Sequence, residues 1–203
     1  LALDIGGTTA KIGTILDGEP RITRELEVGA AAFARSTAKR ANGYPLRTPS
    51  IDLVEIGAGG GSIAWIDSGG ILRVGPESAG ASPGPACYPE GGNLPTLTDA
   101  NVVLGRLNPE YFLGGEMKLS KEAAVTAIKD HCAEKVKKSV VETAAGIIAV
   151  AVSNMVNAVR FITVERGYDP RDFSLGTTGG AGPLHGNLLA RDLNIPRIIV
   201  PKN

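Results

Sequence analysis

The chain has 203 residues, of which 43% are hydrophobic, enough for the core of one large domain or two small ones. Its 21 lysine and arginine residues are balanced by 21 aspartate and glutamate residues, so no net positive charge favours a nucleic acid or an anionic membrane. The 27 glycines exceed the usual share of about 7% and indicate tight turns and close backbone approaches. The composition predicts a soluble, globular protein in which glycine loops are the candidate ligand sites.

The two cysteines, Cys87 and Cys132, are too few and too far apart for a disulfide framework or a zinc knuckle. We therefore expect a reducing, cytoplasmic setting. The sequence does not have the pattern of a secretory signal, a charged segment followed by an apolar run. The chain begins inside a predicted strand and without a methionine, and we interpret it as a piece of a longer polypeptide.

The first part of the chain is predicted to be antiparallel β structure. Residues 1–5 form a short buried strand. Residues 10–28 form a hairpin that turns at Asp17 and Gly18, the strongest short hairpin signal in the sequence. A second hairpin is expected over residues 51–75, with its turn at the glycine pair 69–70.

Glycine and proline mark two further segments, and residues 29–50 have no pattern that we assign. The run GAGGGS at residues 57–62 stands at the centre of a predicted hairpin strand, where glycine suits a bulge or the close approach of a backbone or ligand. Between residues 75 and 98, five prolines among many glycines exclude regular structure for most of the segment. A loop this long inside a compact domain is usually functional or disordered.

Two helices are predicted after this loop. Residues 98–107 form a short helix capped by Thr98 or Asp99. Residues 120–138 form an amphipathic helix capped by Ser120.

A third and longer helix has the best start signal in the chain. Ser139 and Glu142 form a capping box, and the helix is expected to stop at Gly167. Polar residues 153, 154 and 157 interrupt its apolar run well short of the roughly 20 residues that a membrane span needs. The segment is therefore predicted to be a buried core helix.

The last forty residues predict a strand, a glycine turn, a helix and a strand. Residues 172–178 form the first strand, and residues 184–193 form the helix, with Pro183 in its first turn. The closing strand at residues 196–201 is expected to be buried. A strand-to-helix crossover implies parallel pairing, so the chain is predicted to be α/β with a mixed sheet.

The motif DIGGTT at the end of the first strand is the leading candidate site. Gly6 and Gly7 let successive backbone N–H groups point at a phosphate. Thr8 and Thr9 can donate hydroxyl hydrogen bonds to the same oxygens, and Asp4 can hold a magnesium ion directly or through water. The structural alternative is a strand followed by a simple glycine turn. The combination of acid, glycines and hydroxyls favours phosphate contact.

A second glycine cluster, TTGGAGPLHG, lies between the late strand and its helix. Free N–H groups and the helix dipole there favour an anion, or let a flat ring approach the backbone. The spacing of Gly180, Gly182 and Gly186 is not that of the dinucleotide fingerprint, so a nicotinamide enzyme is disfavoured. Close packing of helix on strand explains the glycines equally well.

The remaining reactive side chains carry weaker signals. His185 stands beside the second glycine cluster, and it is either a catalyst or, more commonly for a lone histidine, a cap or core residue. His131 is expected at the surface of the amphipathic helix. Cys87 is interpreted as structural instead of as a nucleophile or metal ligand, because no histidine or acid lies nearby in sequence to activate it.

Several long motifs, in this order, resemble the central domain of the hydantoinase A and 5-oxoprolinase family: DIGGTTAKIG, DLVEIGAGGGSIAWID, LRVGPESAGASPGPACY, TLTDANVVLGRLNPEYFLGG and GGAGPLHG. The resemblance covers nearly the whole chain. It implies an α/β fold like that of actin, sugar kinases and heat-shock chaperone ATPases, a ribonuclease H-like fold in which two halves close over ATP and magnesium.

The resemblance also implies roles for individual residues. Asp4 and Thr8 are the implied catalytic residues, and Asp4 is the implied magnesium ligand. The implied phosphate-binding residues are Gly6, Gly7, Thr8 and Thr9, and the implied adenosine-binding residues are Gly179, Gly180, Ala181 and Gly182. A similar acid-glycine-glycine-threonine turn is expected upstream in full-length members, so this chain alone is expected to bind ATP weakly and to be inactive.

The implied organisation is one catalytic-domain fragment over residues 1–203. Residues 1–75 hold the hairpins and the phosphate loop, residues 76–98 form the glycine- and proline-rich loop, and residues 99–203 contain the helices and the adenosine-loop unit.

The implied reaction is ATP-dependent hydrolysis of a small cyclic amide such as a hydantoin or 5-oxoproline, through phosphorylation of the carbonyl oxygen. A second, B-type subunit is the implied partner. The oxoprolinase branch usually has Thr-Asp where this chain has Ala10 and Lys11, which favours the hydantoinase and ketone carboxylase branch. A non-catalytic or chaperone-like ATP-binding module and a ketone carboxylase subunit are the alternatives.

Overall fold

The computed structural model describes residues 1–24, 26–28 and 44–202. A five-stranded mixed sheet lies at its centre, with the strand order β13-β12-β1-β2-β9. The strands are β1 (Ala2–Ile5), β2 (Ala10–Gly13), β9 (Leu53–Ile56), β12 (Ser174–Thr178) and β13 (Arg197–Ile199). The chain is therefore α/β with a mixed sheet, as predicted.

Parallel and antiparallel pairs meet at β1. This strand pairs in parallel with β12 and antiparallel with β2, although β1 and β12 are separated by most of the chain. β12 and β13 are parallel, which confirms the predicted crossover. The prediction that the closing strand is buried was wrong, since Arg197, Ile198 and Ile199 are all exposed. β13 is an edge strand with a partner on one side only.

The predicted turn of the first hairpin is confirmed, but the predicted extent of its strands is wrong. Asp17 and Gly18 have φ angles of 52° and 85°, the left-handed conformation that a two-residue type I′ turn requires. Beyond this turn, the strands form three separate two-stranded ladders: β3 (Ile15–Leu16) with β4 (Glu19–Pro20), β5 (Ile22–Thr23) with β8 (Ser50–Ile51), and β6 (Leu26–Val28) with β7 (Tyr44–Leu46). Of the predicted second strand, residues 19–20 pair back across the turn, whereas residues 22–23 and 26–28 pair with strands that come later in the chain.

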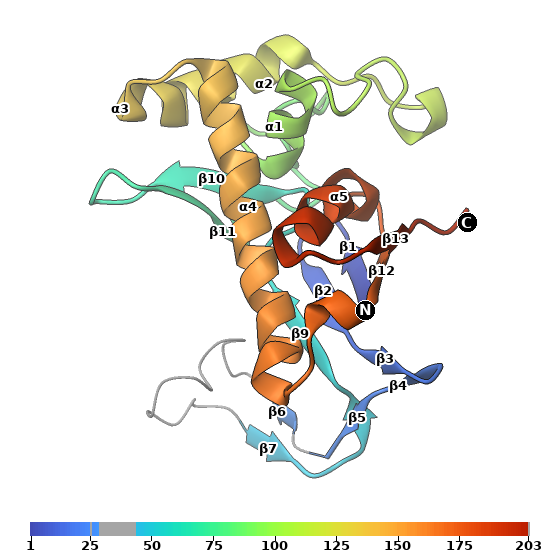
Figure 1. Cartoon of the computed structure of the whole chain (residues 1–203). Helices are drawn as coiled ribbons and strands as arrows, with labels where there is room; N and C mark the ends of the chain where they lie inside the picture. Colours follow the sequence, from blue (N-terminus) through green and yellow to red (C-terminus); the bar gives the residue numbers. More distant parts are fainter. Residues whose placement is uncertain (25, 29–43, 203) are drawn as a thin grey trace.

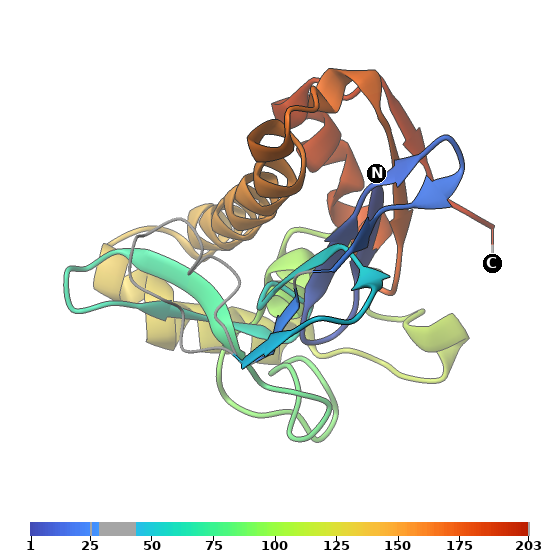
Figure 2. The same cartoon turned by 90° about the horizontal axis from the view of Figure 1, so that it is seen from below.

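The second hairpin is formed by β10 (Ser62–Ile66) and β11 (Leu72–Ser78). Its turn is held by the Asp67 carboxylate, which accepts hydrogen bonds from the N–H groups of Gly69 and Ile71. The hairpin reaches away from the central sheet beside the helices α2 and α3 (Figures 1 and 2). The glycine run before it lies in the connection from β9 to β10, so the prediction that it occupies a strand was wrong.

Helix α1 (Leu97–Val103) begins earlier than predicted. Its cap is Thr96, and Asp99 is the third helical residue of a capping box instead of the cap itself. The buried Asp99 carboxylate also accepts hydrogen bonds from the backbone N–H groups of Ala86 and Cys87, at 3.2 and 2.7 Å. Asp99 therefore ties the middle of the glycine- and proline-rich loop to this helix.

The amphipathic helix is interrupted. Its cap is Ser120, as predicted, and it runs as α2 (Lys121–Ile128), a π-helical segment (Lys129–Ala133) and α3 (Glu134–Val136). Single-turn π segments inside helices are rare and are frequent at functional sites. A short 3₁₀ turn (Leu113–Gly115) precedes this arm.

The long helix α4 (Val140–Ile162) has the predicted capping box of Ser139 and Glu142. It ends at Ile162, and a 3₁₀ turn (Val164–Arg166) continues to Gly167, where the left-handed backbone stops it. The α4 region is long and apolar enough to cross a membrane by composition, but it packs against the sheet, α1 and α5 (Figure 1). Its buried residues form the centre of the hydrophobic core, which confirms the predicted core helix.

Helix α5 (Gly182–Leu193) completes the crossover between β12 and β13. A 3₁₀ turn (Pro170–Asp172) leads into β12. Pro183 lies in the first turn of α5, and Asn194 ends the helix in the left-handed conformation.

Candidate functional site

The two glycine clusters lie at one edge of the central sheet. Because β1 and β12 are parallel, their carboxyl ends meet, and Asp4 stands directly opposite Thr178 in the register. The Thr178 hydroxyl donates a hydrogen bond to the Asp4 carboxylate, 3.3 Å from Oγ1 to Oδ1. Crevices beyond the carboxyl ends of parallel strands are the usual ligand sites of open α/β sheets. The structure thus brings together the motifs that the sequence separates by more than 170 residues.

The first loop, residues 6–9, joins β1 to β2 in a tight turn. The Gly6 N–H donates to the Thr9 carbonyl at 3.1 Å and closes the turn. In the part of the chain that the structure describes, no acceptor is found for the backbone N–H groups of Gly7, Thr8 and Thr9. Gly7 and Thr8 are exposed. Three backbone N–H groups of the loop thus lack an acceptor among the described residues, although the nitrogens of Thr8 and Thr9 lie only 2.6 Å from where a Cβ on Gly59 would stand.

Three glycines at the site have no structural reason to be glycine. A Cβ atom built on Gly6, Gly7 or Gly180 would meet no atom within 4 Å, and none of these residues has a positive φ. Neither packing nor backbone conformation requires the missing side chain. The open space beside these three backbones suits a ligand that must approach closely.

Other glycines of the second cluster are explained by the fold. Gly179 has a φ of 77°, and a Cβ there would lie 2.4 Å from the Ile5 carbonyl oxygen. A Cβ on Gly186 would lie 2.6 Å from the Thr177 side chain, where α5 packs on β12. Gly179 and Gly186 thus serve packing, whereas Gly180 faces open space.

The second loop is tied to the first strand. The Ala181 N–H donates to the Ile5 carbonyl at 3.0 Å. Ala181 is the N-cap of α5, its side chain makes no capping hydrogen bond, and the first turn of the helix carries no acidic residue. The positive end of the α5 dipole is therefore not neutralised by a side chain of its own first turn.

The third glycine run supports the first loop from behind. Gly60 and Gly61 donate backbone hydrogen bonds to the carbonyls of Gly6 and Gly7, at 2.9 and 2.5 Å. A Cβ on Gly59 would lie 2.5 Å from the Thr8 carbonyl carbon. These bonds hold the first loop against the connection from β9 to β10. Sequence reasoning identified the close approach of a backbone as one explanation and missed which backbone it was.

The glycine- and proline-rich loop starts beside the same run. The Ala79 N–H donates to the Gly61 carbonyl at 2.9 Å. Cys87, further along this loop, is fully buried, and burial raises the pKa of its thiol far above the usual range. A buried, protonated thiol is a poor nucleophile, which fits the structural interpretation of Cys87.

His185 is a core residue. Its side chain is fully buried, and its Nε2 lies 3.4 Å from the Nδ2 of Asn101 on α1. Burial, with a smaller effect of Arg106, lowers the pKa of His185 to about 4, so the imidazole is neutral at pH 7. A side chain without exposed surface does not reach a substrate, which favours the core interpretation.

Asp4 is the carboxylate available for a metal ion at this edge. Within residues 1–24, 26–28 and 44–202, no group of three or more histidine, cysteine, aspartate or glutamate side chains is arranged to hold a metal. Magnesium commonly uses one or two carboxylates together with substrate phosphates and water. A single exposed carboxylate beside the turn at residues 6–9 is compatible with that mode.

The whole chain, residues 1–203, matches the family model described as hydantoinase/oxoprolinase. An uncharacterized protein of Methanocaldococcus jannaschii is 53% identical, covering 99% of this chain and 29% of that protein. Among solved structures, the ATP-dependent caprolactamase of Pseudomonas jessenii aligns with a TM-score of 0.83 at 41% identity, covering 99% of this chain and 27% of that one.

A nucleotide-free structure of acetone carboxylase, from work on ATP-dependent acetone carboxylation, aligns with a TM-score of 0.84 at 33% identity. It covers 98% of this chain and 26% of that chain. This chain therefore spans between a quarter and a third of the length of these relatives. With a family model matched from end to end, the chain belongs to the hydantoinase/oxoprolinase family.

Proposed function

We propose that this chain is the nucleotide-binding part of an enzyme that uses ATP to hydrolyse a small cyclic amide, such as a hydantoin, a lactam or 5-oxoproline. The proposed architecture is one half of an actin-like ATPase fold. Residues 1–75 contribute the phosphate loop, residues 76–98 line the substrate side, and residues 99–203 contribute the adenosine loop.

The observation that carries the proposal is the meeting of an exposed carboxylate with glycines that face open space. Asp4 lies at the end of β1 beside Gly6, Gly7 and Gly180. We assign Gly6, Gly7, Thr8 and Thr9 to the phosphates of ATP. We assign Gly179, Gly180, Ala181 and Gly182 to its adenosine.

The proposed catalytic residues are Asp4 and Thr8. Asp4 holds Mg²⁺, which supplies charge neutralisation to the phosphates when bound. The Thr8 hydroxyl and the N–H groups of the first loop donate to the γ-phosphoryl oxygens, where negative charge is spread during transfer.

The proposed reaction overcomes the poor reactivity of an amide. The γ-phosphoryl group moves from ATP to the carbonyl oxygen of the ring, which turns that oxygen into part of a leaving group. Water attacks the activated carbon, the ring C–N bond breaks, the amine takes up a proton and an acyl phosphate remains. A second water attacks the carbon of the acyl phosphate, and the bond from that carbon to the phosphate oxygen breaks. Two waters are consumed in all, both oxygens of the new carboxylate come from water, and the original carbonyl oxygen leaves with phosphate.

Ketone carboxylation is the second candidate, favoured by the 0.84 TM-score against acetone carboxylase. It also begins with activation of a carbonyl oxygen, here that of a ketone, and bicarbonate supplies the carbon of the new carboxyl group. Ala10 and Lys11, which replace the usual Thr-Asp of the oxoprolinase branch, are compatible with this branch. A non-catalytic ATP-binding module is the third possibility. The absence of substrate-dependent turnover would distinguish it from the two enzymes.

We further propose a second subunit as partner, a matching phosphate loop outside the 203 residues, and a cytoplasmic location. The caprolactamase relative is described as a subunit alpha, and the acetophenone and acetone carboxylase relatives are described as gamma and beta subunits. Their far greater length supports a cleft that this chain completes only in part.

The experiment is substrate-dependent ATP hydrolysis by the full-length protein with its co-purified subunit. Cyclic amides labelled with ¹⁸O at the ring carbonyl are supplied with ATP and Mg²⁺, and the released phosphate is analysed by mass spectrometry. The proposal expects the label in phosphate. Turnover that needs a ketone and bicarbonate would establish the second candidate, and ATP binding with no stimulated turnover by either substrate class would establish the non-catalytic one.

A further inference from the structure

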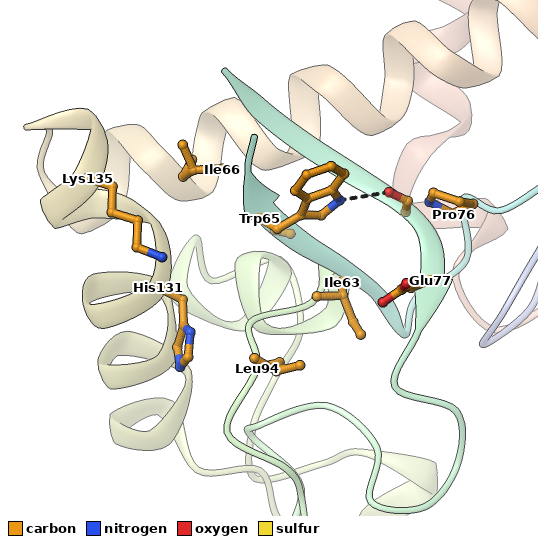
Figure 3. A pocket seen from close by; sticks show the side chains of 10 residues that line it. Ile63, Trp65, Ile66, Pro76, Glu77, Leu94, His131 and Lys135 are labelled. Carbon is orange, nitrogen blue, oxygen red and sulfur yellow. Dashed lines mark hydrogen bonds between the residues drawn. The ribbon is translucent and has the colours of Figure 1, made fainter. Parts of the chain in front are cut away.

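A cavity of about 340 Å³ lies between the β10–β11 hairpin and the helical arm of α2 and α3 (Figure 3). Its lining comes from both strands of the hairpin, from Leu94 and from the π-helical segment with its continuation in α3. None of the lining residues belongs to the two glycine loops at the sheet edge. The cavity is therefore separate from the proposed nucleotide site.

The middle of the cavity is apolar. Ile63 and Leu94 lie below the indole of Trp65 in Figure 3. The indole Nε1 donates to the Gly75 carbonyl at 2.9 Å, which fixes the ring while 43% of the residue stays exposed. A fixed, partly exposed aromatic ring is a suitable contact for the hydrocarbon part of a ligand.

One wall of the cavity carries basic side chains. His131 lies within the π-helical segment, and Lys135 follows four residues later in α3. Both line the cavity on the side facing the hairpin (Figure 3), where His131 is partly exposed and Lys135 is exposed. Among the described residues, neither side chain has an ion-pair or hydrogen-bond partner.

The opposite wall carries an acid. Glu77 of β11 lies on the far side of Ile63 from the two basic residues (Figure 3). Its carboxylate, too, has no partner in the described part of the chain. The cavity thus has basic groups at one end, an apolar middle and a carboxylate at the other end. A complementary ligand has a carboxylate and an ammonium group joined by a hydrocarbon chain.

We propose that this cavity binds a zwitterionic amino acid of the ω-amino type, with its carboxylate at His131 and Lys135, its methylene chain on Trp65 and its ammonium group at Glu77. Opening a lactam ring yields a molecule of this class, because the broken amide leaves one carboxylate and one amine. The choice of an ω-amino acid as the ligand rests on the proposed function. The arrangement of charges in the cavity is independent of the proposed function. The site is a second one, at which the product of the reaction is held away from the nucleotide.

The test is calorimetric titration of the full-length protein, without nucleotide, with 6-aminohexanoate, hexanoate and hexylamine. A dissociation constant of about 1 mM is expected for 6-aminohexanoate, since the ligand is small and its charges are partly solvated. Each truncated ligand should bind about threefold or more weakly, the effect of losing one exposed ion pair. Hexanoate binding as tightly as 6-aminohexanoate would overturn the assignment of Glu77.

Variants make the assignment specific to this cavity. Glu77→Gln should weaken 6-aminohexanoate to the level of hexanoate and leave hexanoate unchanged, whereas Lys135→Met should weaken both acids and leave hexylamine unchanged. Lys121→Met, an exposed lysine at the start of the same helical arm, is the matched control. Equal effects of Lys135→Met and Lys121→Met, or no binding of 6-aminohexanoate by the wild-type protein, would overturn the proposal.

The outcome is independent of the ATPase. ATP hydrolysis by the same preparations is measured separately, and Asp4→Asn should leave binding in the cavity unchanged. If the wild-type protein does not bind 6-aminohexanoate but shows substrate-stimulated ATP hydrolysis, only the second site is rejected. Intact cavity binding without any cyclic-amide turnover rejects the proposed function alone.

Discussion

The hydroxyl of Thr178 donates a hydrogen bond to the carboxylate of Asp4, 3.3 Å across a sequence separation of 174 residues. This contact joins the ends of two parallel strands from which the two glycine loops depart. It places the loops on one edge of the sheet, the arrangement that a single nucleotide bound by both would need.

Asp4→Asn should abolish most metal-dependent turnover. The amide keeps the size of the carboxylate and can still accept from Thr178, but it loses the charge that Mg²⁺ requires. We expect a loss of about a hundredfold or more in kcat, with little change in thermal stability. Asp17→Asn, in the exposed hairpin turn, is the control and should retain full activity. A fully active Asp4→Asn enzyme would remove the carboxylate from the site.

Gly7→Ala and Gly59→Ala should have opposite consequences. The methyl group at position 7 enters open space, so the fold should be unaffected while ATP affinity falls by about tenfold or more through a clash with the phosphates. The methyl group at position 59 meets the Thr8 backbone, which should lower the free energy of unfolding by about 1–3 kcal/mol. Thermal unfolding and nucleotide titration of both variants check this. Unchanged ATP affinity in Gly7→Ala would count against a phosphate at this loop.

Both cysteines should resist alkylation in the folded protein. Cys87 and Cys132 are buried, and burial raises the pKa of each thiol, to about 11 for Cys132. Thiolate, the reactive form, is therefore scarce at pH 8. Peptide mass spectrometry after iodoacetamide treatment should find both thiols unmodified until the protein is unfolded in urea. Rapid labelling of Cys87 in the native state would reopen its role as a nucleophile.

The burial of His185 makes the domain sensitive to acid. Burial lowers its pKa to about 4 in the folded state, whereas an unfolded histidine takes up a proton near the ordinary 6.5. Between these values the unfolded state binds more protons, so stability falls as the pH falls from 6.5 to 4, by about 3 kcal/mol in all. His185→Gln should lose this part of the pH dependence, and His131→Gln should keep it. Thermal unfolding from pH 7 to pH 4.5 distinguishes the two, and equal slopes would contradict the assignment.

Local signals in the sequence predicted the local features of the fold. The Ser139–Glu142 capping box, the Ser120 cap and the Asp17–Gly18 turn are each determined by residues within one turn of each other, and all three were confirmed. The parallel crossover followed from the order of strand, helix and strand.

The errors concern partners that are distant in the chain. The run at Gly59–Gly61 was assigned to a strand because its contact with Thr8 is invisible in a local pattern. Thr96 is the exception, because its capping box with Asp99 is a local signal that the prediction missed. The exposure of β13 depends on the strand order, which periodicity does not determine. Of the candidate site, the residue types were readable from sequence, while the open space beside Gly6, Gly7 and Gly180 required coordinates.

The most direct measurement is a crystal structure of the full-length protein with a non-hydrolysable ATP analogue and Mg²⁺. The account predicts phosphate oxygens within hydrogen-bond distance of the N–H groups of Gly7 and Thr8, the metal at Asp4, and the adenosine against residues 179–182. An analogue bound elsewhere, or held by only one of the two loops, would contradict it.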